Sequence, residues 1–86
     1  MRYRQLEYLL HSHGWSSDED DEGDMYFYRG DAGFWIQWDN SEDDLDDAYL
    51  WYDEAECYIC NIVRLIFTPT RLSIIWNDND IFDFYY

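Results

Sequence analysis

Apolar positions near the N-terminus recur at intervals of three and four residues, which is the spacing of one helical face. The positions on that face are Tyr3, Leu6, Leu9, Leu10 and His13. This spacing predicts a helix over residues 3–13, and Gly14 supplies the usual stop after its last turn. The polar, acidic residues 16–24 that follow predict a loop.

Runs of aromatic and β-branched residues predict strands in the rest of the chain. Residues 25–28 and 34–38 are separated by a glycine-bearing spacer, so they predict a hairpin. Residues 57–67 are almost continuously apolar, as in a central strand that is buried on both faces. Two further strands are expected over residues 72–76 and 81–85, with an Asn/Asp turn between them.

The segment 42–56 carries a second helical pattern. Ser41 can cap a helix whose first turn holds acidic residues, where the helix dipole favours them. The apolar side of this helix is formed by Leu45, Ala48, Tyr49, Tyr52 and Ala55. The competing interpretation is a strand over residues 48–52, because Tyr-Leu-Trp-Tyr suits a sheet and Asp is a poor helix former. The helix is the interpretation that we favour.

Together these elements predict an α+β fold. A chain of 86 residues forms one compact domain, which here spans residues 1–86. We expect a small antiparallel sheet of four or five strands, with an N-terminal helix and a second, acidic helix.

Charge and aromatic content separate this chain from disordered acidic proteins. Twenty Asp and Glu face five Arg and no Lys, giving a formal net charge of −15, yet 48% of residues are apolar and 22% are aromatic. A chain this aromatic can bury a core, so we expect it to fold. So negative a surface excludes direct binding to nucleic acid phosphates. No apolar run approaches the roughly 20 residues of a membrane span, and the first residues lack the apolar core of a signal peptide, so we expect a soluble, cytoplasmic protein without a membrane partner.

The acidic residues are concentrated in tracts. Sixteen of the 20 lie between Asp18 and Glu56, a stretch whose single basic residue is Arg29. Solubility alone is met by a net charge of magnitude about 2–8, so the excess favours a role in binding. The candidate partner-binding residues are the tract acids and one tryptophan among them: Asp18, Glu19, Asp20, Asp21, Glu22, Asp24, Glu42, Asp43, Asp44, Asp46, Asp47, Trp51, Asp53, Glu54 and Glu56.

Catalytic and metal-binding patterns are weak. Cys57 and Cys60 have the C-x-x-C spacing of zinc and redox sites, but on a strand the two side chains point to opposite faces, so we interpret them as packing residues. The run from Asp18 resembles the start of a calcium loop, but Arg29 stands where the bidentate Glu belongs. No carboxylate pair is set apart in an apolar environment, and no nucleophile or phosphate-binding motif is present. We therefore expect no catalytic residue, no metal and no cofactor.

The spacing of the acids approaches that of DNA phosphates. A helix over residues 42–56 would carry eight acids along roughly 22 Å, or one per ~2.8 Å. B-DNA carries one charge per roughly 1.7 Å of its axis. In composition and in acid placement across residues 18–56 and at the C-terminal acids Asp78, Asp80 and Asp83, the chain resembles the DNA-mimic inhibitors of phages and mobile elements, the anti-CRISPR and anti-restriction proteins. The resemblance implies a non-catalytic, cofactor-free inhibitor in the cytoplasm of an infected bacterium, either a monomer or a homodimer. Its partner would be a basic nucleic-acid-binding protein or a CRISPR effector complex.

Trp51 and the partner class each leave alternatives. In the predicted helix Trp51 lies off the apolar face and among acids, where it could anchor an interface, or it could pack on the N-terminal helix. The same charge would also suit an immunity protein or antitoxin that neutralises a basic nuclease toxin. A third alternative is an acidic interaction domain that binds through exposed aromatic residues and depends weakly on salt.

Overall fold

The computed structural model describes the chain except residues 40, 42, 46–47, 54–55 and 78–79, and it describes residues 53 and 56–60 by their backbone alone. Within these described residues, one helix is followed by eight strands. They are α1 (Tyr3–Ser12), β1 (Ser16–Glu19), β2 (Met25–Arg29), β3 (Ala32–Gln37), β4 (Ala48–Asp53), β5 (Glu56–Cys60), β6 (Ile62–Phe67), β7 (Arg71–Trp76) and β8 (Asp80–Tyr85).

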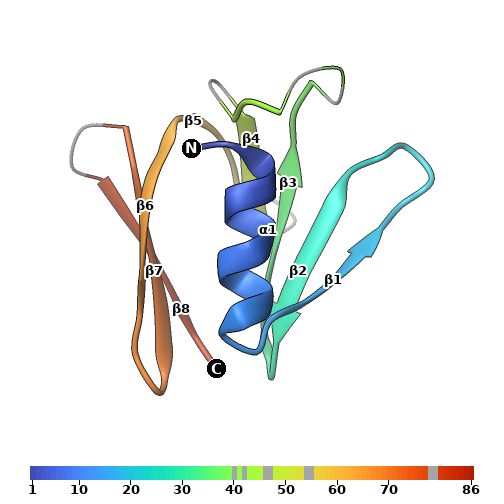
Figure 1. Cartoon of the computed structure of the whole chain (residues 1–86). Coiled ribbons are helices and arrows are strands. Elements are labelled where there is room, and N and C mark those ends of the chain that lie inside the picture. The colour runs from blue at the N-terminus through green and yellow to red at the C-terminus, as the bar shows by residue number, and fades with distance from the viewer. Residues whose placement is uncertain (40, 42, 46–47, 54–55, 78–79) are drawn as a thin grey trace.

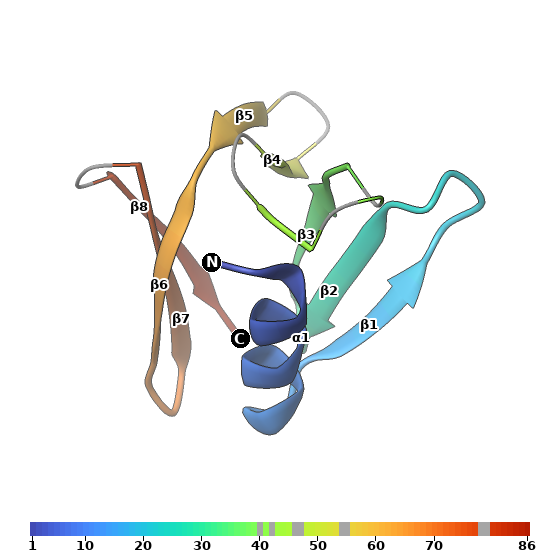
Figure 2. The same cartoon turned by 45° about the horizontal axis from the view of Figure 1, so that its top comes forward.

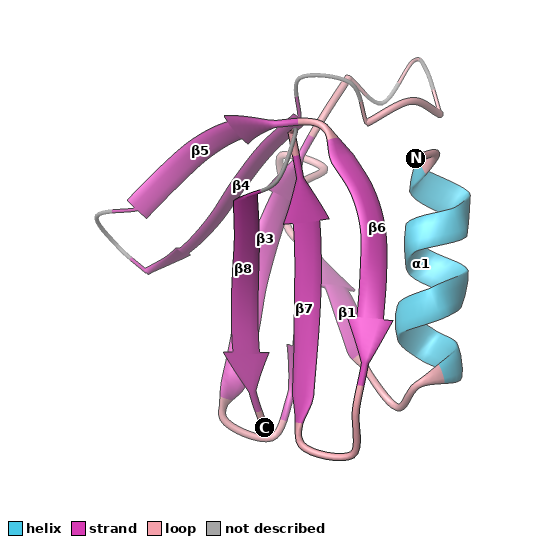
Figure 3. Ribbon diagram, turned by 90° about the vertical axis from the view of Figure 1, so that its left-hand side faces the viewer, coloured by secondary structure: helices cyan, strands magenta, loops and turns pink. Residues whose placement is uncertain are grey.

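The strands form two antiparallel sheets that face each other. The first sheet has five strands in the order β1-β2-β3-β4-β5, and the second has three in the order β6-β7-β8. Figure 1 and Figure 2 show the sheets opening as a wedge, with α1 between them. In Figure 3, α1 runs alongside β6 at the margin of the second sheet. The helix therefore closes the open side of the wedge.

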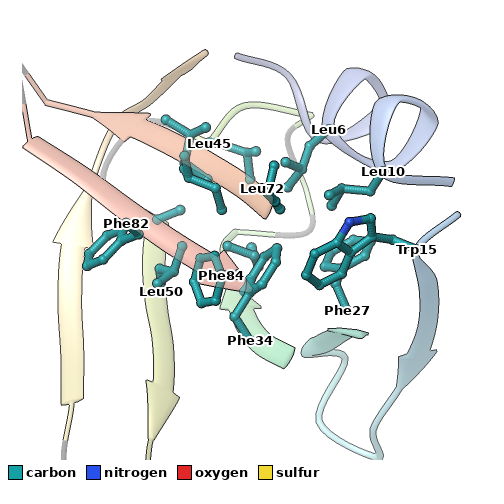
Figure 4. Close-up of a cluster of buried hydrophobic side chains, with 14 residues drawn as sticks. Leu6, Leu10, Trp15, Phe27, Phe34, Leu45, Leu50, Leu72, Phe82 and Phe84 are labelled. Atoms are coloured by element: carbon teal, nitrogen blue, oxygen red, sulfur yellow. The ribbon is translucent and has the colours of Figure 1, made fainter. Parts of the chain in front are cut away.

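The core lies between the inner faces of the two sheets and α1. Phe34 of β3 meets Phe84 of β8 with ring centroids 4.8 Å apart. Leu6 and Leu10 of α1 are fully buried and reach into the same cluster, as Figure 4 shows. At the end of the helix, His13 stacks on Phe67 of β6 at 3.7 Å. Aromatic burial of this extent stabilises a small domain whose charges repel one another.

The predicted N-terminal helix and first hairpin are confirmed. The α-helix begins at Tyr3 and ends at Ser12, and Gly14 adopts the left-handed φ of 84° expected of a stop residue. Strands β2 and β3 pair with Arg29 opposite Ala32, so the predicted hairpin turns through Gly30 and Asp31. Both features depend on local sequence signals.

The prediction of a second, acidic helix is wrong. Residues 48–53 form strand β4, and apart from α1 the described residues contain no α-helix. Ala48 and Leu50 are buried while Tyr49 between them is 42% exposed, which is the alternation of a strand. The α+β prediction with a single sheet is wrong for the same reason, because the fold is mostly β and has two sheets. The competing interpretation of residues 48–52 as a strand is the correct one.

Two other predicted segments, residues 57–67 and 16–24, differ from the structure. Residues 57–67 do not form one central strand, because the chain breaks at Asn61 and passes from β5 in the first sheet to β6 in the second. Asn61 donates its backbone N–H to the Asn77 side chain and accepts the Asn77 N–H, so polar contacts hold this corner. β6 is an edge strand, and Val63 on it is 57% exposed. Residues 16–19, expected in a loop, form strand β1 and pair with β2.

Candidate partner-binding surface

Three acidic connections lie at the same end of the strands. The β1–β2 turn over residues 20–24 lies beyond the pair Glu19 and Met25, next to the end of β3. The β3–β4 connection leaves from that same end. The end of β5 pairs with the start of β4, so Asn61, which directly follows β5, lies at this end as well. Asn77 donates its backbone N–H to Asn61, which places the end of β7 there too. We call this region, at the top of Figure 1, the acidic end. Its described acids are Asp18, Glu19, Asp20, Asp21, Glu22, Asp24, Asp39, Asp43, Asp44 and Asp80.

Asp20 builds the first of these turns. Its carboxylate accepts the backbone N–H groups of Glu22 and Asp24, each at 2.9 Å, and its own N–H donates to the Asp24 carbonyl at 2.9 Å. The turn holds Asp21 and Glu22 exposed at its tip. An acidic residue of the predicted surface thus serves the fold, and its neighbours present charge on a fixed backbone.

Asp24 is buried and is not part of the exposed surface. The residue is only 7% exposed. Burial raises the pKa of Asp24, and the nearby carboxylates of Asp20 and Glu22 raise it further. Asp24 was predicted to bind a partner, but its burial removes it from the contact surface.

The second tract is also partly structural. Asp43 accepts the Tyr3 N–H through its carbonyl and the Arg4 N–H through its carboxylate, both at 3.1 Å. The Arg4 guanidinium lies 3.5 Å from the same carboxylate. Asp44 next to it is exposed, and its backbone forms an isolated antiparallel β-bridge with Arg2. The other predicted members of this tract, Glu42, Asp46 and Asp47, lie outside the described residues.

Asp39 was not selected from the sequence, yet it sits at the acidic end. It is exposed, and the Ser41 hydroxyl and backbone N–H both donate to its carboxylate, at 2.7 and 3.0 Å. These hydrogen bonds lower the pKa of Asp39, which favours its charged form. The signal that could have found it is the Asp-x-Ser turn pattern before the second tract.

The third predicted group does not join the other two. Asp53 pairs with Glu56 across the β4–β5 turn, at the opposite end of β4 from Ala48. Because β3 and β4 are antiparallel, that turn lies away from the acidic end. The side chains of Asp53 and Glu56, and the whole of Glu54, lie outside what the structure describes.

Trp51 does not stand alone among acids. It projects from the face of the first sheet opposite α1, and its ring stacks on Trp35 with centroids 5.9 Å apart and planes 10° apart. The alternative in which Trp51 packs on the N-terminal helix is therefore wrong. Trp35 and its neighbours Tyr26 and Tyr28 were not among the residues predicted from the sequence. Their signal is the alternation in 25–29 and 32–37, where Phe27, Phe34 and Ile36 point into the core.

Chemistry beyond charge is sparse in the described part of the chain. No group of three or more His, Cys, Asp or Glu side chains there is placed to hold a metal ion. Arg29, at the last position of the calcium-loop pattern, lies over the Tyr86 ring at 4.1 Å and donates to the His13 carbonyl. Among the described residues, no helix has the length and apolar character that a membrane crossing requires.

Comparison with known proteins adds no relative. No protein-family model, curated protein or solved structure matches this chain.

What the acidic end offers is exposed negative charge with little local compensation. Asp18, Glu19, Asp21 and Glu22 are exposed, and no cationic side chain of the described residues lies within ion-pairing distance of them. Arg64 and Arg71 belong to the second sheet. The electrostatic potential of such a surface attracts positive charge and repels negative charge.

Proposed function

We propose that this protein is a non-catalytic DNA mimic that occupies the positively charged nucleic-acid-binding groove of a bacterial defence complex and blocks DNA binding. The observation that carries the proposal is the acidic end, where separate segments of the chain present exposed carboxylates at the same end of the strands. A groove built for phosphates would attract these carboxylates by the same electrostatics.

The charge density supports this proposal. The net charge of −15 is carried on a body whose Cα extents are 33 × 30 × 27 Å. Along the longest axis this is about one net charge per 2.2 Å, against one per roughly 1.7 Å of B-DNA. The correction of the second helix to a strand removes the helical charge track expected from the sequence. The charge density is therefore a property of the whole folded domain and not of one helix.

The fixed backbone of the acidic end also supports it. Asp20 closes the β1–β2 turn through its own hydrogen bonds, and Asp43 is tied to the start of α1. Carboxylates on ordered turns give up less conformational entropy on binding than those of a flexible acidic tail.

Within the DNA-mimic class we propose an anti-CRISPR protein, which acts stoichiometrically and without a cofactor in the cytoplasm of the infected cell. The experiment is a gel-shift panel with purified type I and type II CRISPR effector complexes and a type I restriction enzyme, each on its own DNA target. We expect one complex to lose DNA binding at about one inhibitor per complex. The inhibition should weaken between about 150 and about 500 mM salt, because screening shortens the reach of the charges.

Matched variants test the surface. Asp21→Asn/Glu22→Gln removes two exposed charges from the acidic end without touching the hydrogen bonds of Asp20. Asp31→Asn/Asp83→Asn removes the same charge from the β2–β3 turn and the second sheet, and the amide at 83 keeps an acceptor for the Ser73 hydroxyl. We expect only the first pair to weaken inhibition.

Other outcomes would contradict the proposal. Equal weakening by the two pairs would mean that net charge alone matters and that the acidic end is not the contact surface. Inhibition of a basic nuclease toxin, with every DNA-binding complex unaffected, would favour an immunity protein instead.

A further inference from the structure

A row of four aromatic rings crosses the outer face of the five-stranded sheet. We call Tyr28, Tyr26, Trp35 and Trp51 the aromatic row. Successive ring centroids are 5.6, 5.0 and 5.9 Å apart, and the planes of the first and last pairs differ by 19° and 10°. The row therefore runs continuously across β2, β3 and β4.

The row faces away from the core. Tyr26 pairs with Trp35, and Trp35 pairs with Trp51, so the three side chains share one face of the sheet. Among their neighbours along the strands, Phe27, Phe34, Ile36 and Leu50 are fully buried on the other face. The four rings of the row are all partly exposed. Core packing between the sheets therefore does not account for them.

Gly33 allows the row to form. A side chain at Gly33 would share the outer face, because Gly33 pairs with Tyr28 and lies two positions before Trp35. A Cβ atom built at Gly33 would overlap the hydroxyl and ring of Tyr26. The hydroxyl end of Tyr26 thus lies against the bare backbone of Gly33, which fixes the position of the ring in the row.

Charge beside the row indicates what it would bind. Asp18 of β1 pairs with Tyr26, so this exposed carboxylate shares the outer face with the rings. Rigid aromatic faces beside a carboxylate suit a cation. Guanidinium suits them better than ammonium, because it is planar, stacks on Trp and Tyr and pairs with a carboxylate through two hydrogen bonds. The negative charge of the protein disfavours nucleic acid bases at the same face.

We propose that the aromatic row and Asp18 bind arginine side chains of a basic partner segment. This inference deepens the proposed function and rests on it for the nature of the partner. Charge at the acidic end would draw the partner in, and the aromatic row would select arginine over lysine once the surfaces meet.

The test compares two peptides of equal charge, nonaarginine and nonalysine, titrated calorimetrically into the full chain at about 150 mM salt. We expect the arginine peptide to bind at least about threefold more tightly. Trp35→Leu should remove this preference and leave lysine-peptide binding unchanged. Tyr85→Leu changes a ring that is 66% exposed on the second sheet, and it should preserve the preference.

Circular dichroism establishes that each variant folds. If Trp35→Leu does not fold, Tyr28→Leu at the end of the row takes its place, with the same expected loss. Equal affinity of the unmodified protein for the two peptides would overturn the inference. So would a preference that persists in a folded row variant.

The inference and the proposed function fail separately. If the protein displaces DNA from a defence complex but shows no arginine preference, only the proposed arginine binding by the aromatic row would be contradicted. An arginine preference that depends on Trp35, in a protein that displaces no DNA, would support arginine binding by the aromatic row and contradict the DNA-mimic function.

Discussion

The carboxylate of Asp43 accepts a hydrogen bond from the backbone N–H of Arg4, 39 positions earlier in the chain, at 3.1 Å. Arg2, at the N-cap position of α1, makes no side-chain capping bond of its own. The acidic tract therefore supplies the cap that the helix lacks, and the helix dipole favours the negative charge there. An acid that the sequence marks for partner binding is a structural residue.

Loss of this cap should destabilise the protein. We expect Asp43→Ala to lower the free energy of unfolding by about 1 kcal/mol, which corresponds to a fall in Tm of roughly 4–8 °C. Asp43→Asn keeps the acceptor and should retain most of the stability, since the Arg4 side chain is 87% exposed and its ion pair with Asp43 contributes little. Thermal and urea unfolding measure both. An equal loss in the two variants would show that the charge, and not the hydrogen bond, is what α1 needs.

Removing the buried charge of Asp24 should stabilise the protein at neutral pH. The pKa of Asp24 is raised in the folded state, so its contribution to stability is complete below the unfolded pKa of 3.8 and is lost as the pH rises through the folded pKa. We expect Asp24→Asn to raise Tm at pH 7, with the difference shrinking as the pH falls through the raised folded pKa and vanishing below 3.8. Asp31→Asn removes the same charge from an exposed turn. A matching gain there would assign the effect to net charge.

A methyl group at Gly33 should disturb the aromatic row. Alanine normally suits a strand better than glycine, but here it would overlap the Tyr26 ring, so we expect Gly33→Ala to cost roughly 1–3 kcal/mol of unfolding free energy. The penalty should fall sharply in a Tyr26→Ala background, which a double-mutant cycle measures. An unchanged penalty in that background would place the strain elsewhere.

Added salt should stabilise the fold. Screening relieves repulsion among the exposed carboxylates, so we expect Tm to rise by several degrees between about 0.05 and about 0.5 M NaCl. The rise should be smaller in Asp21→Asn/Glu22→Gln, which has less repulsion to relieve. A Tm that does not change with salt would mean that the acids are too far apart to act together.

The sequence predicted the elements whose signals are local. The N-terminal helix has spacing, length and a stop residue, and the hairpin has strand residues on both sides of a glycine turn. Residues 48–53 carry two patterns at once, because Ala48 and Tyr52 fit a helical face while Ala48 and Leu50 fit a strand face. Pairing of β4 with β3 decides between them, and pairing is a long-range event.

The candidate site was predictable in composition but not in arrangement. The acid tracts are plain in the sequence, yet strand register separates the Asp53–Glu56 turn from the other two. Nothing local indicates that Asp43 caps a distant helix or that Asp24 is buried. The aromatic row was missed because residues 48–52 were interpreted as a helix, which hid the alignment of Trp51 with Trp35.

The position of β1 at the margin of the first sheet has a consequence for self-assembly. An edge strand exposes unpaired backbone groups that can pair with the edge of another molecule and seed aggregation. The last two residues of β1 are the exposed acids Asp18 and Glu19. In concentrated solution they repel the matching edge of a second copy, so the same carboxylates that would attract a basic partner also guard an aromatic-rich sheet against polymerisation.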